Sequence, residues 1–171
     1  MSAAGSSRAR ARLLAAAPPG GVFAFVALLA FGGVAIALVS QHVYGMEPCP
    51  WCVLQRLVFA AIGMVALLGL LWRGATGRRV AAAFAMLLAL AGLAAALWQR
   101  FVAERSASCD LTLADRIVAA TRLEVLLPDV FAARASCADA AVALLGVPYA
   151  MWAAALFGIC AAVMARAVWR A

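Results

Sequence analysis

Two cysteines separated by two residues form a C-x-x-C motif, Cys49-Pro50-Trp51-Cys52. Two thiols at this spacing can close a small disulfide ring in the first turn of a helix. The free backbone N–H groups and the helix dipole at that turn stabilise a thiolate. Pro50 suits a first-turn position because it has no N–H to leave unpaired. The motif therefore predicts thiol–disulfide chemistry at the start of a helix.

Arg56 follows Cys52 by four residues, so in a helix it lies one turn further along the same face. A fixed cation at this position can stabilise a thiolate and attract a carbonyl oxygen of a bound ligand. The same arginine can instead be an anchor whose long side chain reaches a membrane surface, with no contact to any ligand.

A C-x-x-C motif is also typical of zinc sites and thioredoxin-like proteins. Structural zinc normally needs four closely spaced Cys or His ligands, whereas 27 residues separate the next two cysteines, Cys109 and Cys137. An arginine beside the motif also repels a metal cation. We therefore predict no metal site and keep a metal centre as the alternative. The fifth cysteine, Cys160, lies in an apolar run and is expected to behave as a small hydrophobe.

The elements that must position these residues are membrane-spanning helices. Of the 171 residues, 68% are hydrophobic and 12% are charged, more apolar surface than a soluble domain of this length can bury. Long apolar runs, the last over 140–165, predict four spans at about 22–43, 53–72, 80–98 and 145–165. We expect a single all-α domain, a four-helix bundle. A cleaved signal peptide is the alternative for the first run, which is longer than such peptides usually are.

The arginines predict the orientation of the bundle. All fourteen basic residues are arginine, and eight lie in segments without acids, at 1–21, 73–79 and 166–171. All seven acids lie in the other two loops, at 44–52 and 99–144. The positive-inside rule then places both termini in the cytoplasm. Because no basic face with interleaved aromatic residues accompanies the net charge of +7, nucleic-acid binding is not expected.

This topology places four cysteines outside the membrane, in the bacterial periplasm, where disulfides persist. We therefore expect two redox-active pairs. Taken alone, Cys109 and Cys137 would form a structural disulfide that staples the long second loop, but an interfacial C-x-x-C makes exchange between the pairs plausible. Residues 115–127 of that loop carry apolar side chains among polar ones, which predicts a short helix on the membrane surface.

The residues resemble the DsbB family of disulfide bond formation proteins, the quinone-dependent reoxidants of periplasmic DsbA. The resemblance covers nearly the whole chain. It rests on four spans with both termini inside and on Gln41-His42-Val43, Pro48-Cys49-Pro50-Trp51-Cys52-Val53-Leu54-Gln55-Arg56, Cys109-Asp110, Leu127-Pro128-Asp129-Val130-Phe131 and Ser136-Cys137-Ala138. It implies an inner-membrane protein whose partners are a DsbA-like thiol oxidase and the quinone pool.

The resemblance also implies roles for individual residues. Reduced DsbA would attack Cys109 and form a mixed disulfide, and Cys137 would exchange with Cys49. Cys52 would lie against the ring of a quinone, either ubiquinone or menaquinone, and Arg56 would bind or polarise that quinone. Gln41 is a candidate hydrogen-bond partner near the quinone. His42 is a candidate proton donor to the reduced quinone, since imidazole titrates near neutral pH, with an interfacial polar residue as the alternative.

Two other functions remain open at this point. A quinone reductase similar to vitamin K epoxide reductase also uses a C-x-x-C in a helical bundle, but there the motif follows the loop pair, whereas here it precedes it. The other alternative is a membrane protein that binds metal or acts as a scaffold without catalysis.

Overall fold

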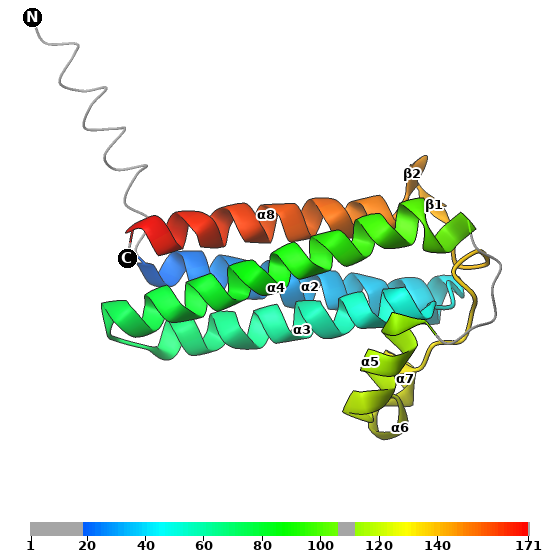
Figure 1. Cartoon of the computed structure of the whole chain (residues 1–171), viewed down its shortest axis with the longest axis horizontal. Helices are drawn as coiled ribbons and strands as arrows, with labels where there is room; N and C mark the ends of the chain where they lie inside the picture. Colours follow the sequence, from blue (N-terminus) through cyan, green and yellow to red (C-terminus); the bar gives the residue numbers. More distant parts are fainter. Residues whose placement is uncertain (1–18, 106–111, 171) are drawn as a thin grey trace, which may run out of the picture.

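The computed structural model describes residues 19–105 and 112–170. Within these ranges four long helices run up and down as a bundle (Figure 1): α2 (Pro19–Tyr44), α3 (Pro50–Leu71), α4 (Ala75–Phe101) and α8 (Tyr149–Arg170). Each of them is long and apolar enough to cross a membrane. The predicted all-α architecture with four spans is therefore confirmed.

Small side chains allow the helices of the bundle to approach one another closely. Helix α4 packs against α8, and α3 packs against both α2 and α4. On α4 the fully buried positions are mostly alanine, at Ala82, Ala85, Ala89 and Ala96. The ring of Phe157 on α8 stacks on Phe59 of α3 with ring centroids 3.8 Å apart. In lipid, such close packing of small residues and rings replaces the hydrophobic effect as the source of helix association.

Gly92 on α4 offers a test of this packing, because a Cβ at this position would overlap the buried ring of Phe157. We expect Gly92→Ala to destabilise the bundle by about 1–3 kcal/mol, the usual effect of overpacking a core. Gly158→Ala is the matched control, since an added Cβ there meets no atom within 4 Å. Thermal unfolding in detergent should show a lower midpoint for Gly92→Ala only. Equal midpoints for the two variants would contradict the close approach of α4 and α8.

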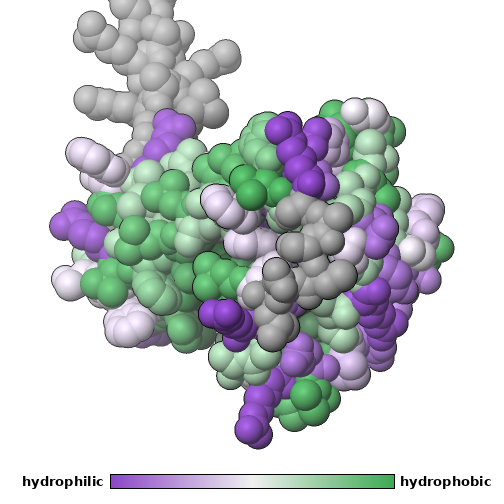
Figure 2. All heavy atoms as spheres, turned by 45° about the vertical axis from the view of Figure 1, so that its right-hand side comes forward, coloured by the Kyte–Doolittle hydropathy of each residue, from purple (hydrophilic) through white to green (hydrophobic). Residues whose placement is uncertain are grey.

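The sides of the bundle expose apolar side chains, as contact with lipid requires. Examples on three different helices are Leu28 at 72% exposure, Leu71 at 76% and Leu87 at 59%. Figure 2 shows hydrophobic residues over much of the visible bundle, with hydrophilic residues gathered mainly toward the end that carries the loops. Figure 1 shows that α2 begins and α8 ends at the same end of the bundle, where α3 also connects to α4.

The fourth long helix begins later than the sequence predicted. Residues 145–148, assigned to the span, belong to a hairpin of β1 (Ala143–Leu144) and β2 (Val147–Pro148), which pair antiparallel. The hairpin turn is Leu145-Gly146, with φ values of 55° and 79°, the left-handed backbone of a two-residue turn. The sequence did not predict this turn, because Leu144 and Leu145 continue the apolar run that was assigned to the helix.

The single surface helix predicted for 115–127 is also corrected. The structure has α5 (Leu113–Thr121), α6 (Leu123–Leu126) and α7 (Pro128–Phe131), after a short 3-10 helix η1 (Ala103–Arg105). Thr112 caps α5 by accepting a hydrogen bond from the N–H of Asp115, and Arg122 ends it with a left-handed backbone at φ 55°. Helix α5 extends sideways from the loop end of the bundle (Figure 1), where it packs against α3.

Candidate active site

The first turn of α3 brings the two sulfurs of the C-x-x-C motif together. Cys49 is the N-cap residue, Pro50 occupies the first turn, and the backbone N–H of Cys52 donates a hydrogen bond to Cys49 Sγ at 3.3 Å. The two Sγ atoms lie 2.8 Å apart, so this is a dithiol that can close to a disulfide of about 2.05 Å with little movement. The predicted location of the motif at the start of a helix is thus what the structure has.

Cys137 of the second loop lies against the same turn. Its sulfur accepts hydrogen bonds from the Cys49 thiol and from the backbone N–H of Trp51. A main-chain clamp holds the loop there, because the N–H groups of Arg134 and Ala135 donate to the carbonyl of Pro48 at 2.9 and 3.3 Å. The sulfurs of Cys137, Cys49 and Cys52 therefore form a continuous row.

Cys49, the middle sulfur of this row, holds its proton most strongly. The hydrogen bond that the Cys49 thiol donates to Cys137, assisted by Cys52 and by burial, raises the pKa of Cys49 well above its ordinary value. The same hydrogen bond, together with the N–H of Trp51, lowers the pKa of Cys137. Of these two sulfurs, Cys137 is therefore the more readily deprotonated, and Cys49 keeps its proton to higher pH.

A pH profile of alkylation tests this assignment. In the reduced protein, iodoacetamide should modify Cys137 with a midpoint below the ordinary thiol pKa of about 8.5, because a lowered pKa keeps the thiolate present at lower pH. Cys49→Ala removes the donor and should move the midpoint for Cys137 upward. Peptide mass spectrometry at each pH gives both curves. An identical midpoint in the variant would show that Cys49 does not supply the stabilising hydrogen bond.

Arg56 lies inside the bundle, with only 5% of its surface exposed. Its NH1 donates to Gln41 Oε1 at 2.6 Å and to the carbonyl of Val130 at 3.0 Å, and its NH2 donates to the carbonyl of Ala37 at 3.2 Å. The guanidinium thus joins α3 to α2 and α7 through three neutral oxygens. This arrangement differs from that of an arginine extended to the membrane surface, the alternative considered from the sequence.

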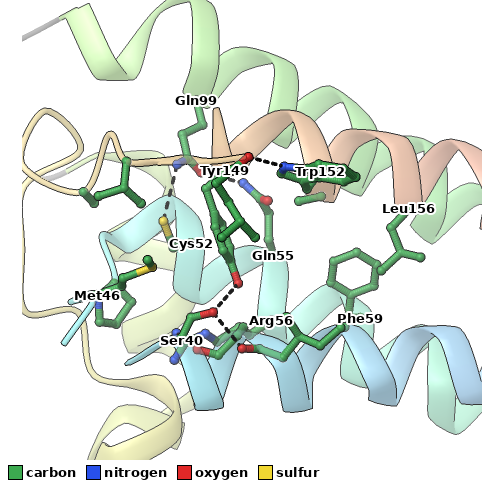
Figure 3. A pocket seen from close by; sticks show the side chains of 18 of the residues that line it. Ser40, Met46, Cys52, Gln55, Arg56, Phe59, Gln99, Tyr149, Trp152 and Leu156 are labelled. Atoms are coloured by element: carbon green, nitrogen blue, oxygen red, sulfur yellow. Dashed lines mark hydrogen bonds between the residues drawn. The ribbon is translucent and has the colours of Figure 1, made fainter. Parts of the chain in front are cut away.

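A cavity of about 420 Å³ opens beside Cys52 and Arg56 (Figure 3). Its walls are mainly apolar and come from α2, α3, α8 and the hairpin, with Phe59 and Leu156 at one side and Trp152 at another. A few polar side chains converge on it, namely Ser40, Gln55, Arg56, Gln99 and Tyr149, and the exposed Glu47 also lines it. An apolar cavity of this size with a small number of polar groups is typical of a site for a small organic molecule.

The chain is similar to known proteins. The family described as Disulfide bond formation protein DsbB matches residues 20–167. The chain belongs to the DsbB family. It is 39% identical over 137 residues to Disulfide bond formation protein B of Aromatoleum aromaticum, covering 77% of this chain and 79% of that protein. The protein of the same name from Herminiimonas arsenicoxydans is 32% identical over 146 residues, covering 85% and 92%. No solved structure matches.

Membership of the DsbB family makes the chain a membrane thiol–disulfide oxidoreductase, a thiol oxidase with several membrane-spanning helices. The predicted family, fold class and enzyme class are thereby confirmed. Among the described residues, no group of three or more His, Cys, Asp or Glu side chains could hold a metal ion.

The structure brings together most, but not all, of the residues singled out from the sequence. Cys109 lies outside the described residues. Gln41 is buried and holds Arg56, whereas His42 is exposed, bonds to the carbonyl of Leu38 in its own helix and does not line the cavity. Cys160 is buried in the bundle core beside other apolar side chains, as expected for a small hydrophobe.

Several polar residues of the site were missed from the sequence. Gln99 was placed in a loop because the apolar run ends at Trp98, although α4 continues to Phe101. Gln55 was part of the quoted motif but was given no role. Tyr149 and Ser40 both line the cavity and share a hydrogen bond, with their hydroxyl oxygens 3.2 Å apart (Figure 3). The sequence offered only a general indication of these residues, since a polar side chain in or near an otherwise apolar span often marks a functional site.

Proposed function

We propose that this DsbB-family protein reoxidises a periplasmic DsbA-like thiol oxidase and passes the electrons through two cysteine pairs to a membrane quinone. The observation that carries the proposal is the row of three sulfurs, Cys137, Cys49 and Cys52, which ends at an apolar cavity. Among the cysteines of the described residues, only Cys52 borders this cavity.

The row fits a relay in which the outer pair reacts with protein and the inner pair with quinone. Reduced DsbA attacks Cys109 of a Cys109–Cys137 disulfide and releases Cys137 as a thiolate. That thiolate attacks Cys49, and Cys52 is released beside the cavity. The lowered pKa of Cys137 favours it as the attacking sulfur, since the thiolate is the nucleophile in disulfide exchange.

The residues around the cavity fit a quinone head group. Its flat, apolar ring suits the walls formed by Phe59, Trp152 and Leu156, and its carbonyl oxygens need donors such as the guanidinium of Arg56. Gln41 Nε2 is a buried donor with no hydrogen-bond partner among the described residues, next to Arg56, and an oxygen acceptor there would satisfy it. When bound, a quinone, whether ubiquinone or menaquinone, would supply the capacity to accept two electrons and two protons.

In this proposal Arg56 binds the quinone oxygen and Gln41 positions Arg56. Cys52 presents its sulfur at the wall of the cavity, and the apolar walls exclude water from it. We leave His42 out of the quinone site because its ring faces outward and bonds within α2.

The proposed location is the bacterial inner membrane, with both termini in the cytoplasm. The support is that Arg73, Arg78, Arg79 and Arg166 belong to the segments at one end of the bundle, away from the cysteine loops. A membrane-impermeant thiol reagent added outside reduced spheroplasts should then label Cys137. Labelling only after the inner face is opened would contradict this orientation.

The direct test is oxidation of a reduced DsbA-like protein by the purified chain with added ubiquinone or menaquinone. We expect catalytic turnover that requires quinone and stops when quinone is omitted. Turnover without quinone would contradict the cavity's proposed ligand. No oxidation of the DsbA-like protein, by a preparation whose cysteine pairs are oxidised, would contradict the proposed partner.

The partner step has a separate prediction. With Cys137→Ser, the Cys109 thiolate can attack the disulfide of an oxidised DsbA-like protein, which forms a mixed disulfide and releases one DsbA thiolate. No loop sulfur is then left to resolve this bond, so a covalent complex should accumulate to a large fraction of the chain. Non-reducing gel electrophoresis measures it. Cys160→Ala is the control, because its sulfur lies in the bundle core, and should give no complex. Equal trapping by a Cys109→Ser/Cys137→Ser double variant would show that DsbA bonds to another residue.

A further inference from the structure

Two glutamines from different helices are buried beside Cys52 and have no role in the relay described so far. Gln55 on α3 is 5% exposed and Gln99 on α4 is 3% exposed. Burying an amide within membrane-spanning helices costs free energy unless its hydrogen bonds are made. Polar residues at such positions therefore often have a functional role. In Figure 3 both side chains reach toward the cavity wall at which Cys52 lies.

The two amides form a directed chain that ends on sulfur. Gln55 Nε2 donates to Gln99 Oε1 at 2.6 Å, and Gln99 Nε2 donates to Cys52 Sγ at 3.3 Å. The amide of Gln99 could in principle present either its oxygen or its NH₂ group to the sulfur. By engaging the oxygen, the Gln55 donor leaves the NH₂ group of Gln99 for Cys52.

We propose that Gln99 is a catalytic residue that stabilises Cys52 as the leaving sulfur, and that Gln55 is a positioning residue that fixes the orientation of the Gln99 amide. The inference rests on the proposed function in taking Cys52 as the sulfur released toward the cavity. A correctly oriented N–H donor stabilises a thiolate more than a neutral thiol or a disulfide sulfur, because hydrogen bonds to charged groups are the stronger ones.

The step in which the amide acts is the exchange between the two pairs. The Cys137 thiolate attacks Cys49 Sγ, so a Cys137–Cys49 bond forms and the Cys49–Cys52 bond breaks. The electron pair of the broken bond remains on Cys52 Sγ, and no proton is needed. Gln99 Nε2 already lies within hydrogen-bonding distance of the sulfur that gains this charge. A better-stabilised leaving thiolate departs faster.

The test measures the redox equilibrium of the inner pair without quinone or DsbA. In a Cys109→Ser/Cys137→Ser background, only the Cys49–Cys52 pair exchanges with a dithiothreitol redox buffer at pH 8. Gln99→Leu should shift the equilibrium about 10-fold toward the disulfide, because the dithiol form loses its stabilising donor. Gln55→Leu should shift it in the same direction by a smaller factor. Alkylation and intact-mass measurement give the oxidised fraction.

A double variant separates the two roles. If Gln55 acts only through Gln99, Gln55→Leu should add nothing to Gln99→Leu, whereas independent contributions would multiply. A purely structural role would lower the melting temperature and leave the redox equilibrium unchanged, since both redox forms would lose the same contact. Cys160→Ala is the control: it changes a buried side chain of the bundle core that does not line the cavity, and should leave the equilibrium within twofold.

An unchanged equilibrium in folded Gln99→Leu would overturn the proposal, as would a Gln55→Leu effect that persists in full when Gln99 is already leucine. If Gln99→Leu does not fold, Gln99→Met, which keeps the chain length without the donor, takes its place. Failure of the quinone or the DsbA assignment would appear in the turnover assay and would not alter this equilibrium.

Discussion

Cys52→Ser is expected to abolish quinone-dependent turnover, lowering kcat by about 10³-fold or more, as removal of a reacting group usually does. A serine oxygen cannot form the inner disulfide, so no sulfur at the cavity can receive electrons from Cys49. The Cys109–Cys137 pair remains, and the variant should therefore still oxidise one equivalent of reduced DsbA-like protein. Stopped assays of oxidised DsbA per chain distinguish this single turnover from catalysis.

The control for this variant is Cys160→Ala, which removes a buried sulfur that lies away from the cavity. Its turnover should remain within about twofold of that of the unmodified chain, since the change is small and apolar. Repeated turnover by Cys52→Ser would mean that electrons leave the protein from another sulfur, and the proposed end of the relay would be wrong.

Arg56→Lys is expected to raise the quinone concentration needed for half-maximal turnover by about 10- to 100-fold. The guanidinium bonds at once to Gln41, Val130 and Ala37, through two nitrogens held in one plane. Lysine keeps the charge but has one nitrogen, so it cannot make these contacts and face the cavity in the same way. Losing one or more hydrogen bonds to a charged donor gives a change of this size.

Turnover measured against quinone concentration gives the apparent KM and kcat for Arg56→Lys. Arg100→Lys is the matched control, because Arg100 is partly exposed and bonds to Glu104 outside the cavity, and it should behave as the unmodified chain does. Exchange between the inner pair and dithiothreitol should survive in Arg56→Lys. If both kinetic constants are unchanged, Arg56 only joins the helices and does not bind quinone.

Much of the fold follows from hydropathy, because lipid leaves a helix as the only satisfactory state for an isolated apolar segment. Positions one turn apart were also predictable, which is why Cys52 and Arg56 face the same cavity as expected. The start of α3 at the C-x-x-C motif was indicated by Pro50, whose missing N–H suits a first turn. These predictions depend on local geometry and need no knowledge of tertiary contacts.

What the sequence did not predict depends on contacts between distant segments. Cys137 reaches Cys49 through main-chain hydrogen bonds to Pro48, which almost any residue type at 134 and 135 can make. The amide chain from Gln55 to Cys52 requires α3 and α4 to be in register, and periodicity does not give the register of two helices. The hairpin before α8 could not be predicted because Leu145 adopts a left-handed backbone conformation, which leucine rarely does.

The burial of Cys49 has a consequence for how the protein is insulated from its surroundings. Its sulfur has no exposed surface and lies in an apolar cluster with Trp51, Val118 and Phe131, formed by the start of α3 and the loop helices. A small thiol dissolved in the surrounding water therefore has no direct path to Cys49 and can meet the inner pair only at Cys52, whereas Cys137 reaches Cys49 because it is part of the attached loop. The protein thus limits reduction of Cys49 by small dissolved thiols through restricted access rather than through binding affinity. This protection lasts only while the second loop stays bound to Pro48.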